Sequence, residues 1–369
     1  MRQIGVHLGA RSYQVLVGSE LLGRIGAECA RLGLGRRAAV VTQTSVAAYA
    51  RAVAESLREA GFTPVVMEVP TGESAKSFDE ARGLWDAFLG HGLDRSSAVV
   101  AVGGGVVGDL AGFAAAGYMR GLAYVQVPTT LLAQVDASVG GKVAVNHPRA
   151  KNLIGAFYQP RLVLIDPDTL ASLPEREYRS GLAEVVKTGA ALNAELFATL
   201  ETETPAVRRR DSALLAGVIG TCCAEKATIV EQDEREESGL RMILNYGHTV
   251  GHALETSDEY RTWLHGEAVA VGMVAAARLG TRLGLTDAAT ADRQVGLLAA
   301  LDLPTRFGAP TPRVLWETLR HDKKARDGRV PFVLLKALGH AEVCFDVPSE
   351  LVLDVLEEIH NAPTATAGQ

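Results

Sequence analysis

The first part of the chain alternates short apolar runs with amphipathic stretches of helical length. The apolar runs predict strands at residues 38–42, 63–69, 98–102, 124–127 and 162–165. Between them, apolar positions at helical spacing predict helices at 45–60, 77–89 and 106–119. Alternation around Gly9-Ala10-Arg11 predicts an N-terminal hairpin. Strands that alternate with helices indicate an α/β domain with a Rossmann-like parallel sheet.

Beyond Pro167 the pattern becomes almost entirely helical. Predicted helices cover residues 175–200, 212–230, 242–257, 266–283, 288–301 and 349–359, and short apolar runs at 332–335 and 342–345 predict a small hairpin. The boundary falls between residues 166 and 175. We therefore predict an α/β domain over residues 1–170, followed by a mostly α-helical domain over residues 171–369.

Composition narrows the classes of partner. The formal net charge of -6 argues against nucleic acid as the main partner, because phosphate-backbone binding usually needs a basic face. No uninterrupted apolar stretch approaches the roughly 18 residues of a membrane span, and the N-terminus is patterned as a hairpin. The four cysteines lack CxxC spacing and are typical of reduced thiols. We expect a cytoplasmic protein without a membrane partner.

The most informative local pattern is a glycine-rich turn, Gly103–Gly108, placed after an apolar strand and before a helix. It matches GxGxxG, in which glycines let a pyrophosphate approach a helix N-terminus. Such turns also occur without a ligand, and the acidic residue expected about 20 positions later is missing. Upstream, Glu73 and Lys76 open another predicted helix, where they could bind ribose and phosphate or equally well cap the helix.

A loop-like segment after the glycine turn is crowded with polar and cationic side chains. This pattern predicts either an anion pocket or a solvated surface. Arg120, at a predicted helix C-terminus, could join such a pocket or complement the helix dipole. The members of the segment are Asp136, Lys142, Asn146, His147, Arg149, Lys151 and Asn152.

The helical half contains a candidate metal site. His248 and His252 lie four residues apart on one helical face, and His265 opens the next predicted helix. Glu184 and Lys187 share a face of an earlier helix. Three histidines so close together favour a divalent metal. Spacing alone pairs His248 with His252, but it does not decide which two histidines bind or whether Glu184 joins them.

Taken together, residues from about Glu73 to Leu335 resemble the 3-dehydroquinate synthases of the sugar-phosphate cyclase family. The motifs are GGGVVGDLAGF, YMRG, VPTTLLAQVDASVGGK, VNHP, KNLIGAFYQP, LPEREYRSGLAEVVKTG, DERE, GLRMILNYGHTVGHALE, LHGEAVAVGM and HDKKARDG. The resemblance implies an NAD-binding N-terminal domain and a metal- and substrate-binding C-terminal domain. It also implies an active site between them and a homodimer.

The resemblance also implies individual roles. Zn²⁺ or Co²⁺ would be bound by Glu184, His248 and His265, which replaces the helical histidine pair and leaves His252 for substrate. NAD would contact Glu73, Lys76, Gly104, Gly105, Val106, Asp109, Thr129, Thr130, Leu132, Lys142, Lys151, Ser172 and Leu173. Substrate would contact Arg120, Lys142, Lys151, Asn152, Lys226, Arg241, Asn245, His252, Lys323 and Lys324, and the catalytic group would comprise Asp136, Lys142, Lys187, Asn245 and His252.

The implied substrate is a small phosphorylated sugar acid, 3-deoxy-D-arabino-heptulosonate 7-phosphate. It would lose phosphate and close into 3-dehydroquinate, with NAD oxidising and then re-reducing the same molecule. Residues 143–145 read Val-Ala-Val where the family more often has Thr-Gly-Val, which leaves substrate preference partly open. The alternatives are an amino-dehydroquinate synthase or another cyclase of secondary metabolism, a metal-dependent alcohol dehydrogenase, and an inactive NAD- or metal-binding regulator.

Overall fold

The computed structural model describes residues 1–257, 261–320 and 330–361. The chain forms two compact units. The first comprises Met1–Pro174 and Arg210–Glu237, all of it described, and the second comprises Glu175–Arg209 and the chain from Ser238 onward. The sequence predicted one boundary near residue 170. In the structure, a later segment that contains helix α8 (Ser212–Gln232) also packs with the first unit and is grouped with it.

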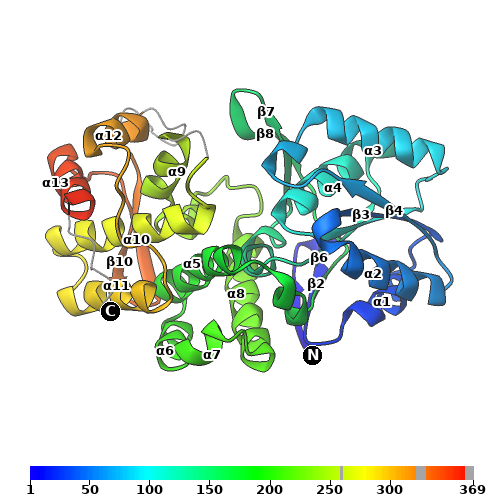
Figure 1. Cartoon of the computed structure of the whole chain (residues 1–369), viewed down its shortest axis with the longest axis horizontal. Helices are drawn as coiled ribbons and strands as arrows, with labels where there is room; N and C mark the ends of the chain where they lie inside the picture. Colours follow the sequence, from blue (N-terminus) through cyan, green and yellow to red (C-terminus); the bar gives the residue numbers. More distant parts are fainter. Residues whose placement is uncertain (258–260, 321–329, 362–369) are drawn as a thin grey trace. The chain divides into compact units, whose positions relative to one another are not determined.

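The first unit is built on a seven-stranded sheet (Figure 1) with the order β1-β2-β9-β6-β5-β3-β4. Only β1 runs antiparallel to its neighbour, and the other pairs are parallel. The five predicted strands and the predicted N-terminal hairpin are confirmed. The strands are β1 (Arg2–Val6), β2 (Tyr13–Val17), β3 (Arg37–Gln43), β4 (Thr63–Val69), β5 (Ala98–Gly103), β6 (Ala123–Pro128) and β9 (Leu162–Ile165).

Helices cover both faces of this sheet (Figure 1). Val100 and Val102 of β5 join the apolar cluster under α1 and α2, whereas Val99 and Ala101 join the cluster under α3 and α4. Burial on both faces explains why the strands are continuous apolar runs. The helices are α1 (Ile25–Arg31), which the sequence pattern did not predict, α2 (Ala47–Glu59), α3 (Phe78–Gly90) and α4 (Gly105–Gly117).

Helix α8 is long and apolar enough to cross a membrane by length and composition alone. In the structure it packs against β1, β2 and the short π-helix η6 (Ala133–Ala137) of the same unit. Cys222 and Cys223 on this helix are fully buried. The apolar side chains of α8 therefore contribute to the core of the first unit, which is the ordinary reason for such a composition in a globular domain.

The cationic segment between Asp136 and Asn152 is more regular than the loop-like pattern indicated. It forms a hairpin of β7 (Lys142–His147) and β8 (Ala150–Phe157), which pair antiparallel. The hairpin lies against α4, where a Cβ on Gly112 would be only 2.4 Å from Val143 Cγ1. Close approach to a glycine thus buries Val143, while β8 stays largely exposed.

The second unit is organised around α10 (His265–Arg282), which is buried along most of its length. Around it pack α5 (Glu175–Leu192), α9 (His248–Ser257), α11 (Ala288–Ala300), α13 (Ser349–Asn361) and β10 (Phe332–Ala337), which pairs with β11 (His340–Cys344) (Figure 1). The predicted hairpin is confirmed. Shorter helices are α6 (Ala194–Thr202), α7 (Thr204–Arg208) and α12 (Pro312–Arg320).

Two predicted helices of this unit are broken in the structure. The one predicted at 175–200 stops before Asn193, whose side chain accepts a 2.8 Å hydrogen bond from Leu196 N and so caps α6. The one predicted at 242–257 contains a separate 3-10 helix, Leu240–Asn245. Gly247 adopts a left-handed conformation (φ +77°) between it and α9. This break makes His248 the first residue of α9.

Candidate active site

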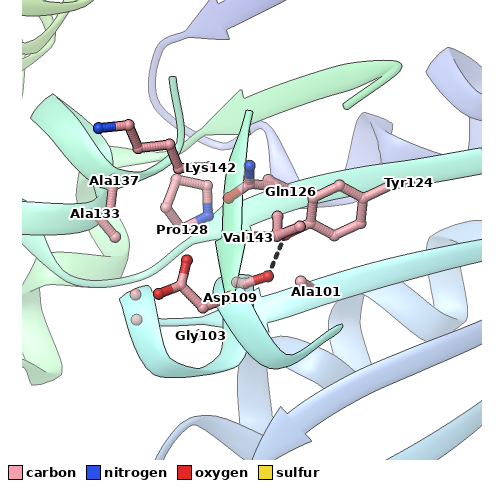
Figure 2. Close-up of a pocket in the computed structure, with 13 residues that line it drawn as sticks. Ala101, Gly103, Asp109, Tyr124, Gln126, Pro128, Ala133, Ala137, Lys142 and Val143 are labelled. Atoms are coloured by element: carbon pink, nitrogen blue, oxygen red, sulfur yellow. Dashed lines mark hydrogen bonds between the residues drawn. The ribbon is translucent and has the colours of Figure 1, made fainter. Parts of the chain in front are cut away.

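A pocket lies beside the glycine turn, at the carboxyl ends of β5 and β6 (Figure 2). β5 ends at Gly103, α4 begins at Gly105, and Thr129 N donates a 2.9 Å hydrogen bond to Gly103 O. A Cβ on Gly104 would lie 2.9 Å from Thr130 Cγ2, so any larger residue here would require the Thr130 side chain to move. Within the fully described first unit, no side chain caps α4. Its first backbone N–H groups therefore remain available to an anion.

Lys76 is the centre of a polar network next to this pocket. Its side chain is 5% exposed, and its Nζ lies 2.6 Å from Asp109 Oδ2 and 3.7 Å from Glu73 Oε1. Lys76 Nζ also donates a hydrogen bond to Asn152 Oδ1. Burial raises the pKa of Asp109, and the ammonium group of Lys76 opposes that rise. Lys76 thus contacts Glu73 and Asp109, which like Lys76 itself were predicted to bind NAD. It also contacts Asn152, which was predicted to bind substrate.

Asn146, a member of the predicted polar segment to which the family resemblance gave no role, joins two sides of this network. Its Nδ2 donates a 2.8 Å hydrogen bond to Glu73 Oε1, and its Oδ1 accepts a 2.8 Å bond from Asn152 N. Asn152 itself has a positive φ of 53°, a conformation that asparagine tolerates better than most residues. The clue in the sequence was the VNHP motif, but only the β7–β8 hairpin brings Asn146 to Glu73.

Other residues predicted to bind NAD follow β6 and β9 in the first unit. Thr129 Oγ1 is buried and has no hydrogen-bond partner among the described residues. Thr130 Oγ1 accepts a 3.3 Å bond from Ala133 N, with Leu132 between them on the approach to η6. Ser172 Oγ accepts a 2.9 Å bond from Tyr49 and is followed by Leu173. The buried, unpartnered hydroxyl of Thr129 marks a place where a polar ligand group fits.

Two cations predicted to bind substrate are paired with acids in the first unit. Lys226 of α8 contacts Asp136, whose backbone oxygen lies 2.7 Å from Lys226 Nζ and whose carboxylate accepts a second bond. Lys142 forms an ion pair with Glu236, which follows α8 and was not predicted. An anionic substrate must therefore share or displace these carboxylates. Lys151 lies half-buried on β8, in the same unit.

In the second unit, Glu184 of α5 meets the histidines that open α9 and α10. Nε2 of His248 and of His265 lie 3.6 and 3.5 Å from Glu184 Oε1. Ligand atoms about 2.1 Å from a tetrahedral ion stand about 3.4 Å apart. Glu184 is almost completely buried, and its Oε1 has no hydrogen-bond partner among the described residues. Because a buried carboxylate oxygen without a partner is costly, a cation beside Oε1 fits this group of three.

The other ring nitrogen of each histidine has its own partner. His248 Nδ1 lies 3.1 Å from Tyr246 O, and His265 Nδ1 lies 3.2 Å from Glu255 Oε2. With Nδ1 protonated, Nε2 is left to face Glu184. Burial lowers the pKa of His265, but the carboxylates of Glu184 and Glu255 outweigh it and raise the pKa to about 10. A divalent ion at Nε2 would satisfy Glu184, while the Nδ1–H of His265 satisfies Glu255.

His252 is close to both histidines but is not grouped with Glu184. Its ring centroid lies 5.1 Å from that of His248 and 5.9 Å from that of His265. It belongs instead to a second cluster, with Glu255 and His265. Glu255 was missed by the sequence analysis, although its position three residues after His252 places it on the same helical face. Lys187, one turn after Glu184, holds Nζ 2.5 Å from Glu184 Oε2.

The remaining predicted residues are divided between the units. Arg241 is buried in the 3-10 helix that ends with Asn245, both in the second unit. Arg120 ends a 3-10 turn of the first unit, Tyr118–Arg120, with a positive φ of 68°. Lys323 and Lys324 lie outside the described residues.

Comparison with known proteins places these features in a family. The family models described as 3-dehydroquinate synthase N-terminal and C-terminal match residues 66–180 and 181–325. A 3-dehydroquinate synthase from Geobacter metallireducens is 54% identical over 92% of the chain and 94% of its own length.

Two solved structures are similar along almost the whole chain. A 2-deoxy-scyllo-inosose synthase complexed with carbaglucose-6-phosphate, NAD⁺ and Co²⁺ is 27% identical with a TM-score of 0.87, over 97% of this chain and all of that one. A 2-epi-5-epi-valiolone synthase from Streptomyces hygroscopicus with NAD⁺ and Zn²⁺ is 30% identical with a TM-score of 0.86, over 94% of this chain and 96% of that one.

Proposed function

The chain belongs to the 3-dehydroquinate synthase family, and we propose that it converts 3-deoxy-D-arabino-heptulosonate 7-phosphate into 3-dehydroquinate and phosphate. The observation that carries this proposal is the 54% identity to a 3-dehydroquinate synthase over 92% of the chain. The overall reaction breaks a carbon–oxygen bond without net oxidation, which makes the enzyme a lyase. Its product serves aromatic amino-acid synthesis by the shikimate route.

NAD and a divalent metal, Zn²⁺ or Co²⁺, are the proposed cofactors. Both solved relatives contain NAD⁺ and one of these metals. The unpartnered hydroxyl of Thr129 and the uncapped start of α4 suit NAD, while the orphaned Glu184 Oε1 between two imidazoles suits the metal. When bound, NAD supplies a transient oxidation of a substrate hydroxyl and the metal makes that hydroxyl more acidic.

The protein's own side chains would bind and orient the substrate. The proposed ligands of the substrate phosphate are Lys142, Asn152, Asn245 and His252. The proposed ligands of the substrate carboxylate are Lys226 and Arg241. Asp136, Lys151 and Lys187 are proposed to contact the hydroxyls and the ring. Ammonium and guanidinium groups suit phosphate and carboxylate because charge-assisted hydrogen bonds to them are strong. Such fixed counter-charges act chiefly by positioning the reacting atoms.

We also propose that the protein is a cytoplasmic homodimer. Its cysteines are free, as expected in a reducing compartment. Strand β8 exposes Leu153, Ile154 and Phe157, in a hairpin whose outer edges pair with no other strand of the described first unit. Exposed apolar side chains beside free strand edges are typical of contact surfaces between chains. Sedimentation equilibrium of the cofactor-loaded protein measures the mass directly.

The decisive experiment follows phosphate release from 3-deoxy-D-arabino-heptulosonate 7-phosphate together with NADH absorbance. We expect phosphate release that requires both NAD and metal, with no net NADH. A Glu184→Gln preparation serves as the matched control, because a contaminating phosphatase would remain active in it. NADH accumulation without phosphate would identify a dehydrogenase instead. Turnover of the amino analogue alone would identify an amino-dehydroquinate synthase.

A further inference from the structure

A second carboxylate, that of Glu255, lies beside the proposed metal site. It follows His248 and His252 on α9 at positions i, i+4 and i+7, so the three side chains share one helical face. Glu255 is buried, with 7% of its surface exposed, and its Oε2 lies 3.2 Å from His265 Nδ1. A carboxylate is rarely buried without such a specific partner.

The backbone of His265 is already fixed by other residues of the second unit. Gly266 N donates a 3.0 Å hydrogen bond to Ser180 Oγ, and Leu264 N donates a 3.0 Å bond to Glu267 Oε2. Arg176 binds both oxygens of Glu267, at 2.6 and 2.7 Å. Arg176, Ser180 and Glu184 are spaced by four residues along α5. One face of α5 thus holds the start of α10 and also supplies the first proposed ligand.

These contacts leave the imidazole ring of His265 to be oriented separately. Its side chain is 32% exposed, so packing alone does not fix the ring. His248 differs, because its side chain is 8% exposed and its Nδ1 faces a backbone carbonyl, Tyr246 O. His265 is therefore the proposed ligand whose orientation depends most on a side-chain partner.

We propose that Glu255 is a positioning residue for the metal ligand His265, an inference that rests on the metal site of the proposed function. Its carboxylate accepts the Nδ1–H of His265, which fixes the tautomer and turns Nε2 toward Glu184 Oε1. A negatively charged acceptor also makes the ligating nitrogen more basic. Glu255 thereby strengthens metal binding without coordinating the ion.

The test measures Co²⁺ affinity of metal-depleted full-length protein by chelator competition, together with the visible absorption spectrum of bound Co²⁺. Glu255→Gln should weaken Co²⁺ binding by about 10- to 100-fold and change the spectrum, as expected when a carboxylate that hydrogen-bonds to a metal-ligating histidine is lost. Glu255→Asp keeps the charge and should recover part of the affinity. Glu350→Gln removes an exposed carboxylate of α13 and should match wild type. Unchanged affinity and spectrum in Glu255→Gln would overturn the proposal.

Two further variants separate this inference from the metal site on which it depends. If Glu184→Gln and His265→Ala lose Co²⁺ while Glu255→Gln keeps it, the metal site stands and the role of Glu255 is refuted. If Glu184→Gln binds normally while Glu255→Gln does not, the ion sits with His252, Glu255 and His265, and Glu255 is a ligand. If wild type binds no Co²⁺, the metal part of the proposed function fails as well. If Glu255→Gln does not fold, Glu255→Asp takes its place. Its shorter side chain should weaken Co²⁺ binding relative to wild type, and wild-type affinity would overturn the proposal.

Discussion

At the scale of single residues, the candidate metal site distinguishes His265 from the neighbouring His252 by the distance to Glu184. His252 and His265 both lie near His248, yet only His265 places a nitrogen 3.5 Å from the buried oxygen of Glu184. Helical spacing indicated the pair His248 and His252, because it reports only contacts within one helix. The group around Glu184 needs three helix positions to meet, which local sequence does not encode. The family motifs implied it instead.

His265→Ala should therefore lose the metal, whereas His252→Ala should keep it and lose turnover. NAD affinity should stay near wild type in both, because the residues proposed to bind NAD all belong to the first unit. Metal content after gel filtration and a fluorescence titration with NAD measure the two effects. Metal retained in His265→Ala, or lost in His252→Ala, would contradict the proposed ligand set.

At the scale of elements, glycines bring the ligand-bearing helices together. A Cβ on Gly272 of α10 would lie 1.8 Å from Gly247 O, and one on Gly266 would lie 1.8 Å from Ser180 O. The sequence showed glycines beside each histidine, but it could not show that they mark helix contacts. For the same reason, the sequence pattern predicted one helix over residues 242–257, because the helical pattern continues through Gly247. Only the close contact of Gly247 with α10 explains why the 3-10 helix and α9 are separate.

Gly272→Ala should destabilise the protein by about 1–3 kcal/mol or more, because a backbone carbonyl cannot move aside as a flexible side chain can. Gly296→Ala on α11 is the matched control, since nothing lies within 4 Å of its added Cβ. That variant should be neutral or stabilising by up to about 1 kcal/mol, because alanine favours helix. Urea unfolding followed by circular dichroism compares them. Equal unfolding midpoints would refute the packing argument.

At the scale of the whole molecule, much of the architecture was predictable from the sequence. Two-sided burial gives β3, β5 and β6 their apolar runs, and the alternation of these runs with helical stretches is enough to indicate a parallel sheet. The place of α8 was not predictable, because its apolar pattern suits any buried helix. Only its contacts with β1 and η6 assign it to the first unit.

This division predicts that each cofactor protects a different unit from hydrogen exchange. At short exchange times, NAD should slow exchange at the β5–α4 turn and around Glu73, because bound ligand suppresses local opening. Zn²⁺ should slow exchange near Glu184 on α5 and at the starts of α9 and α10. Helix α2 bears no proposed ligand and should change little with either. The site assignment would fail if Zn²⁺ protected the glycine turn, or if NAD alone protected the helix starts that carry the histidines.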